Sequence, residues 1–240
     1  MKQRIIGGGI ALAIFIPFLI LGGLPFQFLV GVLAMIGVAE LLHMKRLEFF
    51  SFEGVLAILG AFVLTVPLGD YLTFLPIDAN FSLYGLVVFL LLAGIVLNSS
   101  SYSFDDATFP IAASLYVGIG FQNLVSARMS GIDKVFLALL IVWATDIGAY
   151  MIGQRFGRHK LMPIVSPNKT IEGSLGGILS AVVVAFIFML FNKSVYAPYN
   201  FFLMLLFVAL FSICGQFGDL VESSIKRHFG VKDSGKLIPG

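Results

Sequence analysis

The chain has 240 residues, of which 59% are hydrophobic and only 12% are charged, and its formal net charge is +2. Its mean hydropathy is +1.01. Ordinary soluble domains carry about 45–50% apolar and about 25% charged residues, so this composition excludes a soluble globular protein. Several apolar runs approach or reach the roughly 20 residues that a membrane-spanning helix needs, and they lack the alternation of a membrane β-barrel. The composition therefore predicts an all-α, polytopic membrane protein.

Hydropathy along the chain predicts eight membrane-spanning helices. Their predicted ranges are 5–22, 25–42, 54–68, 82–98, 107–125, 132–152, 173–191 and 201–219. The third range is short for a full span. The basic start of the first range is similar to that of a signal peptide, but the apolar run continues toward a second span without a clear small-residue cleavage site. We therefore expect it to be retained as the first helix.

The positions of Lys and Arg test this count independently, because cytoplasmic loops of membrane proteins are enriched in these residues. With the N-terminus inside, only Arg128, Lys134 and Lys193 of the fifteen Lys and Arg residues fall outside. We therefore expect an integral protein, with the N-terminus and the polar loops on the cytoplasmic side of a bacterial inner membrane. The twelve inner basic residues are Lys2, Arg4, Lys45, Arg46, Arg155, Arg158, Lys160, Lys169, Lys226, Arg227, Lys232 and Lys236.

The chain has no evident internal repeat and no polar stretch long enough to fold as a separate soluble domain, so we expect one membrane domain over residues 1–240. Two predicted inner segments, 153–172 and 220–240, are too rich in polar side chains to be simple turns. Topology alone would explain the basic residues Arg155, Arg158 and Lys160. We expect the two segments to lie on one membrane face and to close over one polar cavity.

Three carboxylates fall within or near the ends of predicted spans, where a charge is costly and therefore suggests function. Glu40 lies near the inner end of the second span, where water or Lys45 would meet it. Asp146 lies deeper in the sixth span, and both a structural hydrogen bond and a functional role remain open for it. Asp219 lies at the end of the eighth span, where it meets a basic segment.

The neighbours of Asp219 are informative about its chemistry. If the helix continues, Asp219, Glu222, Ser223 and Lys226 are at positions i, i+3, i+4 and i+7, on one stripe of the helix. Carboxylate and hydroxyl oxygens suit Mg²⁺, which uses one or two carboxylates and completes its shell with water and phosphate oxygens. The structural alternative is an amphipathic helix end with a Glu222–Lys226 salt bridge.

The segment SPNKTIEG precedes the seventh predicted span. Ser166 and Pro167 are a suitable N-cap and first-turn pair, and Asn168 and Thr170 are alternative caps. The helix N-terminus and Lys169 would then face an anion at the cytoplasmic surface. The sequence is consistent with a phosphate site here, and equally with a capped helix that has no ligand.

Gly173 and Gly177 follow this segment with the GxxxG spacing that allows two membrane helices to approach closely. The same spacing permits a homodimer. The sequence lacks a Walker loop and a GxSxG motif, and its three histidines do not have zinc-ligand spacing. If the chain is an enzyme, its pattern of carboxylates and cations is typical of metal-assisted phosphoryl transfer.

Two stretches, DIGAYMIGQRFGRHKLMPIVSPNKTIEGSLGG and QFGDLVESSIKRHFGVKDSGKLIPG, resemble the phosphatidate cytidylyltransferase (CDP-diacylglycerol synthase) family. The resemblance is detailed over residues 143–240, which we expect to be the catalytic part. Residues 1–142 match only as generic hydrophobic spans. The residues that fill the family's C-terminal pattern are Ser223, Lys226, Arg227, Lys232, Asp233, Gly235, Pro239 and Gly240.

The resemblance implies a membrane enzyme that makes CDP-diacylglycerol from CTP and phosphatidic acid. It implies Mg²⁺ as cofactor, bound by Asp219, and catalytic roles for Lys169, Lys226 and Arg227. It implies CTP, phosphatidic acid and membrane lipid as partners, and no nucleic acid. The residues predicted to bind substrate are Ser166, Asn168, Thr170, Glu172, Ser223, Lys232, Asp233 and Asp146.

The sequence departs from the family pattern at its end. In the family, the pattern continues after the Pro-Gly turn with His-Gly-Gly and an Asp-Arg-x-x-Asp type segment that contributes to the metal site. The sequence stops at Gly240, so we expect this chain to carry only part of the metal site, and a ninth helix to be encoded beyond it.

Two other functions fit parts of the sequence. A CTP-dependent polyprenol or dolichol kinase also joins CTP to a lipid in a helical membrane body. A transporter would use Asp146 and Asp219 as coupling carboxylates, but matched, Gly/Pro-broken helices in two halves are missing.

Overall fold

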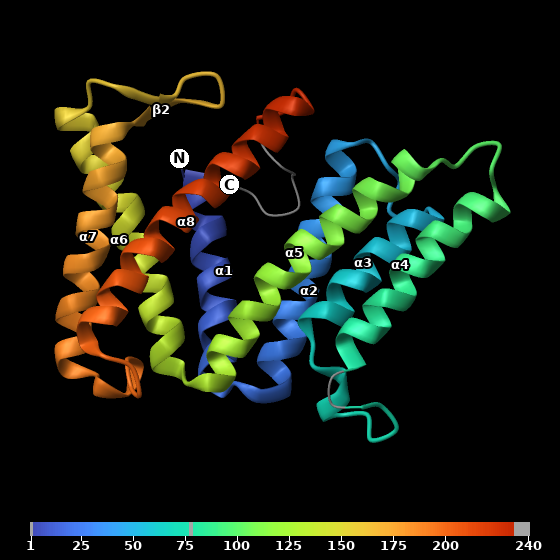
Figure 1. Ribbon diagram of the computed structural model, residues 1–240, viewed down its shortest axis with the longest axis horizontal. Coiled ribbons are helices and arrows are strands. Elements are labelled where there is room, and N and C mark those ends of the chain that lie inside the picture. The colour runs from blue at the N-terminus through green and yellow to red at the C-terminus, as the bar shows by residue number, and fades with distance from the viewer. Residues whose placement is uncertain (1, 77–78, 233–240) are drawn as a thin grey trace. The chain divides into compact units, whose positions relative to one another are not determined.

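The computed structural model describes residues 2–76 and 79–232, which form helices and one small hairpin (Figure 1). This part of the chain is almost entirely helical, as the composition predicted. The α-helices within it are α1 (Lys2–Leu21), α2 (Gly23–Met44), α3 (Phe52–Thr65), α4 (Ala79–Leu97), α5 (Phe104–Ser130), α6 (Ile132–Phe156), α7 (Ile171–Phe191) and α8 (Phe201–His228). A two-stranded antiparallel hairpin, β1 (Lys160–Met162) and β2 (Ser166–Thr170), separates α6 from α7.

Six of these helices, α2 and α4 to α8, are long and apolar enough to cross a membrane. This confirms a polytopic helical membrane protein. The other two predicted spans correspond to shorter apolar helices, Gly7–Leu21 within α1 and Phe52–Thr65. Helix α1 as a whole has 20 residues and α3 has 14, and about 20 are needed for a full span. Six spans are therefore supported, and the count of eight or nine stays a prediction.

The chain divides into two compact units, and the boundary between Ser130 and Gly131 lies in the connection from α5 to α6. In the first unit, α3 packs against α2 and α5. Small residues carry this contact: Ala34 and Val38 of α2 lie in a buried cluster with Ala57 and Ala61 of α3. Small side chains allow helix backbones to approach closely, which is how membrane helices gain packing contacts where lipid is as apolar as the side chains.

Arg128, one of the basic residues predicted to lie outside, links α5 to the C-terminal end of α1 in the first unit. Its guanidinium donates hydrogen bonds to the carbonyl oxygens of Leu19 (2.7 Å) and Ile20 (3.1 Å) at the end of α1. The α1–α2 connection passes through Gly22, whose φ is +66°, and a Cβ there would lie 2.5 Å from the guanidinium. A cation at a helix C-terminus satisfies carbonyls that have no partner within the helix.

In the second unit, α6 and α7 run side by side along most of their length (Figure 1). Glycines make the close approach possible. A Cβ on Gly173 would lie 2.8 Å from the carbonyl oxygen of Ala149, and one on Gly177 would lie 2.7 Å from that of Thr145. The GxxxG spacing therefore serves packing inside the chain, as one of its two interpretations predicted, and this stripe does not face a second copy.

Helix α8 is much less buried than α6 or α7, and its buried residues are Val208 and Ser212. Val208 packs in a cluster with Ile141 of α6 and Ala181 of α7. The hydroxyl groups of Ser212 and Thr145 are 2.7 Å apart in the buried contact between α8 and α6. These contacts fix the apolar part of α8 within the second unit.

Candidate active site

The segment between α6 and α7 folds differently from the prediction. Ser166 and Pro167, predicted to start the helix, lie in strand β2, and the helix begins only at Ile171. The cap is Thr170, one of the two predicted alternatives, whose Oγ1 accepts a hydrogen bond of 3.1 Å from the N–H of Gly173. Pairing with β1 extends the backbone of residues 166–170, and this pairing overrides the local capping preference of Ser-Pro.

Glu172 holds the base of the hairpin. Its carboxylate accepts hydrogen bonds from the backbone N–H groups of Arg158 (3.1 Å) and His159 (3.2 Å), and Nδ1 of His159 lies 2.6 Å from Oε1. The backbone N–H of Ile171 also donates to the carbonyl oxygen of His159 at 2.9 Å. The structure therefore gives Glu172, predicted to bind substrate, a contact with the hairpin backbone.

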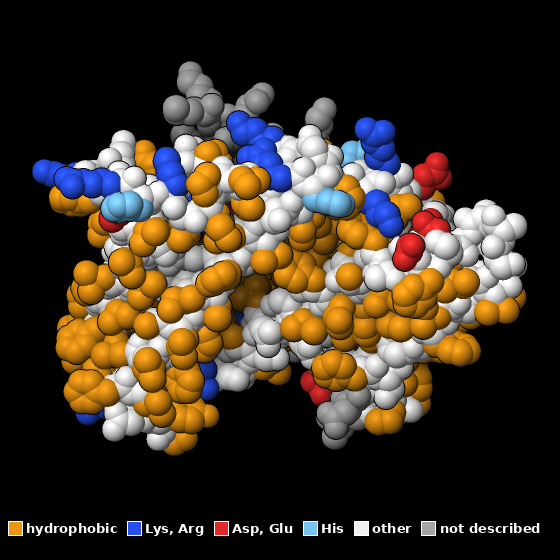
Figure 2. All heavy atoms as spheres, turned by 45° about the horizontal axis from the view of Figure 1, so that its top comes forward, with side chains coloured by type: hydrophobic (Ala, Val, Ile, Leu, Met, Phe, Trp, Pro, Cys, Tyr) orange, Lys and Arg blue, Asp and Glu red, His pale blue; other side chains and the backbone are white. Residues whose placement is uncertain are grey.

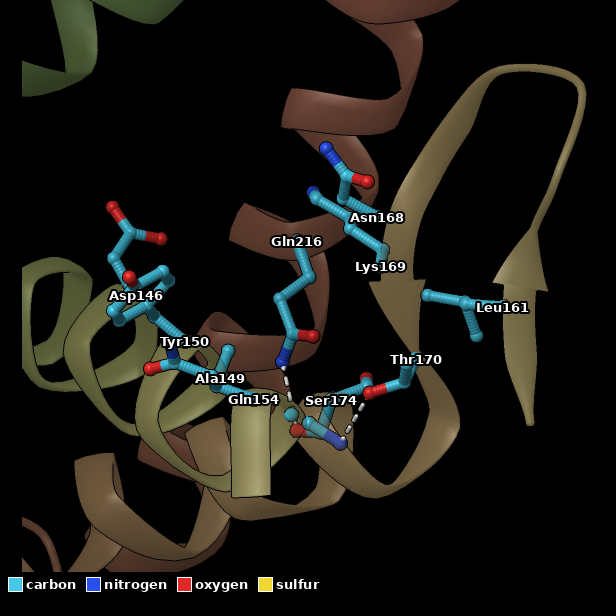
Figure 3. Close-up of a pocket in the computed structure, with 12 residues that line it drawn as sticks. Asp146, Ala149, Tyr150, Gln154, Leu161, Asn168, Lys169, Thr170, Ser174 and Gln216 are labelled. Carbon is cyan, nitrogen blue, oxygen red and sulfur yellow. Dashed lines mark hydrogen bonds between the residues drawn. The ribbon is translucent and has the colours of Figure 1, made fainter. Parts of the chain in front are cut away.

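A cavity of about 430 Å³ lies at this end of the second unit, between α6, the hairpin, α7 and α8. Figure 3 shows its side chains arranged around an open space, with Asp146 and Tyr150 on one side and Asn168, Lys169 and Leu161 on the other. Its lining is Asp146, Ala149, Tyr150, Gly153, Gln154, Leu161, Asn168, Lys169, Thr170, Gly173, Ser174 and Gln216.

The charged groups at the cavity come from three separate elements: Asp146 and Lys169 line it, whereas Asp219 is not among the lining residues and is connected to it through Lys169. Lys169 of β2 forms an ion pair with Asp219 of α8. Asp146 of α6 is close enough to both groups for their charges to act on it. The structure thus brings together three predicted site residues that are up to 73 positions apart in the sequence. Carboxylates and an ammonium group around a cavity can bind a cation and an anion next to each other.

The sequence analysis did not identify several lining residues, although their helical spacing from Asp146 and Asp219 could have indicated them. Tyr150 and Gln154 follow Asp146 at i+4 and i+8 and so share its face of α6. Gln216 precedes Asp219 by three residues on α8, and its amide donates a 3.2 Å hydrogen bond to the carbonyl oxygen of Ser174 on α7 (Figure 3). Tyr150 and Gln216 fall inside apolar runs, where they were counted as parts of spans, whereas Gln154 falls in the polar segment 153–172 without having been singled out.

The other predicted residues lie away from the cavity lining. Lys226 forms a 2.9 Å salt bridge with Glu222 on the last turns of α8, as the structural alternative predicted. Ser223 and Arg227 lie on the same turns, and Lys232 follows the helix. Asp233 lies outside the described residues. The expectation that the C-terminal segment lines the cavity is thus not met by residues 220–232, since the lining residue from α8 is Gln216.

Basic side chains gather at the polar end of this unit. Arg155, Arg158 and Lys160 are exposed around the start of the hairpin. In the left part of Figure 2, Lys and Arg side chains stand above a broad apolar surface of the helices. This separation of charge from apolar surface is typical of a helical unit that meets the membrane surface at this end.

The donor set of the cavity fits a hard divalent cation. Mg²⁺ is held by one or two carboxylates and keeps water or phosphate oxygens as its other ligands, and Asp219 and the nearby Asp146 supply such a set. Among residues 2–76 and 79–232, no group of three or more His, Cys, Asp and Glu side chains could enclose a metal ion. Water or phosphate oxygens would supply the other ligands of an ion held by these carboxylates.

The fold and this site define a nucleotidyltransferase embedded in a membrane. A family model described as the cytidylyltransferase family matches residues 2–240, and the chain belongs to that family. Three relatives are each named phosphatidate cytidylyltransferase: those of Staphylococcus epidermidis (42% identical over 242 residues), Staphylococcus haemolyticus (41% over 244) and Staphylococcus aureus (39% over 242). Each alignment covers 100% of this chain and 90% of the relative. The predicted family is confirmed, and the similarity extends through residues 1–142.

Proposed function

We propose that this protein transfers the cytidylyl group of CTP to phosphatidic acid, giving CDP-diacylglycerol and pyrophosphate for phospholipid synthesis. The observation that carries the proposal is the contact between Lys169 and Asp219 beside the cavity. It joins the two segments that resemble the phosphatidate cytidylyltransferases, in a chain about 40% identical to proteins of that name.

The reaction needs positioning and charge neutralisation more than a protein nucleophile. A phosphate oxygen of phosphatidic acid attacks the α-phosphorus of CTP. The new P–O bond forms as the bond from the α-phosphorus to the bridging oxygen breaks, and pyrophosphate leaves with that electron pair. A phosphomonoester has a second pKa of about 6, so it is largely dianionic near neutral pH and needs no general base.

Lys169 is placed to neutralise phosphate charge, because it lines the cavity from β2. Lys226, Arg227 and Lys232 would add positive charge from the end of α8 and the residues after it. Cations of this kind stabilise charge that gathers in the transition state. Asn168 and Thr170 lie on either side of Lys169 in the strand and line the same cavity.

We further propose Mg²⁺ as the cofactor, held by Asp219 with Asp146 nearby. When bound, it would neutralise phosphate oxygens and orient the triphosphate. The basic residues at the polar end favour a cytoplasmic position for this site and for the N-terminus, where CTP is available. The acyl chains of the lipid would reach the cavity from between the helices. A homodimer remains a prediction. Gly173 and Gly177 do not support it, because they pack against α6 of the same chain.

The purified full-length protein, mixed with CTP and phosphatidic acid in detergent micelles, should form CDP-diacylglycerol and release pyrophosphate only when Mg²⁺ is present. A polyprenol should be neither a substrate nor a competitor. Phosphorylation of the prenol with release of CDP would instead support the kinase alternative. Absence of both products would contradict any CTP-dependent transfer.

A further inference from the structure

The ion pair between Lys169 and Asp219 joins two groups that we assign to different ligands: Lys169 to phosphate and Asp219 to the divalent cation. Lys169 is the cation among the described cavity-lining residues, and Asp219 is the carboxylate we assign to the divalent cation. An ammonium group and a divalent cation are both attracted to the same carboxylate oxygens. While the pair is formed, the charge of Lys169 is offset by a carboxylate, which weakens its attraction for a phosphate.

The pair is open enough to be exchanged. The Lys169 side chain is 30% exposed and that of Asp219 is 55% exposed. Half-exposed ion pairs stabilise a structure only weakly, because water solvates both charges when they separate. The two residues also differ in how firmly their backbone is held. Lys169 lies on the hairpin, which Glu172 fastens at its base. Asp219 lies beyond the buried residues of α8.

The charge of the site changes sign with this exchange. Counted as ionised, Asp146, Asp219 and Lys169 together carry one more negative than positive charge, so these three groups by themselves repel a triphosphate. A divalent cation on Asp219 would reverse this balance. It would also release an ammonium group in the same place, which is a binding group for phosphate oxygens.

We propose that Lys169 and the divalent cation exclude each other at Asp219, so that cation binding releases Lys169 to hold the nucleotide phosphates. The identity of the anion rests on the function proposed above, whereas the exclusion itself does not. Linkage then requires that cation and nucleotide each raise the affinity for the other by the same factor. Lys169 would then couple the binding of the cation to the binding of the nucleotide, in addition to binding phosphate itself.

Mn²⁺ binding by the full-length protein, measured by electron paramagnetic resonance without nucleotide or lipid substrate, tests the exclusion. Lys169→Met removes the competing ammonium group, so Mn²⁺ should bind about three- to fivefold more tightly, the upper part of the range for a half-exposed ion pair. The matched control Lys193→Met removes an exposed lysine between α7 and α8 that is not among the cavity-lining residues, and it should leave Mn²⁺ affinity within about twofold of the starting protein. Equal or weaker binding by Lys169→Met would overturn the proposal.

A second measurement needs no substitution at Lys169. Amine-reactive labelling followed by mass spectrometry should show that Mg²⁺ alone accelerates modification of Lys169 in the unaltered protein, since release from Asp219 exposes the amine. In Asp219→Asn the labelling should be fast and independent of Mg²⁺. Labelling of Lys169 that Mg²⁺ leaves unchanged in the unaltered protein would refute the exclusion, even if the enzyme proved active with CTP. Loss of activity toward CTP alone would refute only the proposed function.

Discussion

The carboxylate of Glu172, in the first turn of α7, accepts hydrogen bonds from the backbone N–H groups of Arg158 and His159, which precede β1. One side chain thus fastens the beginning of the hairpin to the helix that follows it. Lys169 and Asn168 lie on the returning strand and line the cavity. The position of these two side chains therefore depends on Glu172, although Glu172 is not among the lining residues.

Glu172→Ala should lower kcat/KM for CTP by about ten- to a hundredfold, because small displacements of a binding group are costly in catalysis. Hydrogen exchange of residues 158–162 should increase in the same variant. His159→Ala is the matched control: it removes the exposed imidazole and keeps both backbone N–H donors, so its kinetics should stay close to those of the unaltered protein. Normal exchange and kinetics in Glu172→Ala would show that the hairpin holds its place without this contact.

The α6–α7 contact gives a prediction about stability. In Gly177→Ala the new methyl group would meet the carbonyl oxygen of Thr145 at 2.7 Å, so the helices must separate. Overpacking of this kind costs about 1–3 kcal/mol, and the thermal unfolding temperature in detergent should fall. Gly215→Ala is the control, because a Cβ there meets nothing within 4 Å. Similar unfolding temperatures for the two variants would contradict the close packing.

The buried hydroxyl pair between α6 and α8 gives a third prediction. Thr145 donates to the carbonyl oxygen of Ile141 at 2.7 Å, so Ser212 is the donor in the 2.7 Å contact with Thr145. A double-mutant cycle of Thr145→Val and Ser212→Ala should give a coupling of about 0.6 kcal/mol, with about 1.7 kcal/mol as an upper bound for such pairs in membranes. Additive effects on the unfolding free energy would show that the two hydroxyl groups do not interact.

Ser212 lies seven residues before Asp219, on the same face of α8. Because α8 has few buried residues, the hydroxyl pair contributes to the placement of Asp219 as well as to stability. Both single variants should therefore need a higher Mg²⁺ concentration for half-maximal activity. Thr108→Val, which removes an exposed hydroxyl bonded only within α5, should leave this concentration unchanged.

Local features of the sequence predicted the elements that depend on local chemistry. Apolar runs located every α-helix of the described chain to within a few residues at most ends, and the Thr170 cap was among the predicted alternatives. The end of α8 was wrong by nine residues, because residues 220–228 are too polar for a membrane span although they continue as a helix. Hydropathy shows only where an apolar run ends. A helix can continue past that point as an amphipathic segment, as α8 does.

Contacts between distant segments were beyond sequence reasoning. The strand conformation of Ser166 and Pro167 depends on pairing with β1, and their local preference for a helix start was misleading. The ion pair between Lys169 and Asp219 depends on the packing of α8 beside α6 and α7, which no spacing in the sequence encodes. The two residues were predicted separately as a phosphate ligand and a metal ligand, and their direct contact was not foreseen.

The last prediction concerns Asp219. Asn has the size of Asp and keeps one oxygen but loses the charge, so Asp219→Asn should lose nearly all cytidylyl transfer at every Mg²⁺ concentration without unfolding. Glu222→Gln is the matched control on the same helix, since Glu222 pairs with Lys226; loss of a surface pair costs only about 0–1 kcal/mol. If Asp219 served only to pair with Lys169, its variant would behave like this control and remain active. CDP-diacylglycerol formation by the two variants, measured over a range of Mg²⁺ concentrations, separates these outcomes. Near-normal turnover by Asp219→Asn would remove the metal assignment and the proposed competition with Lys169.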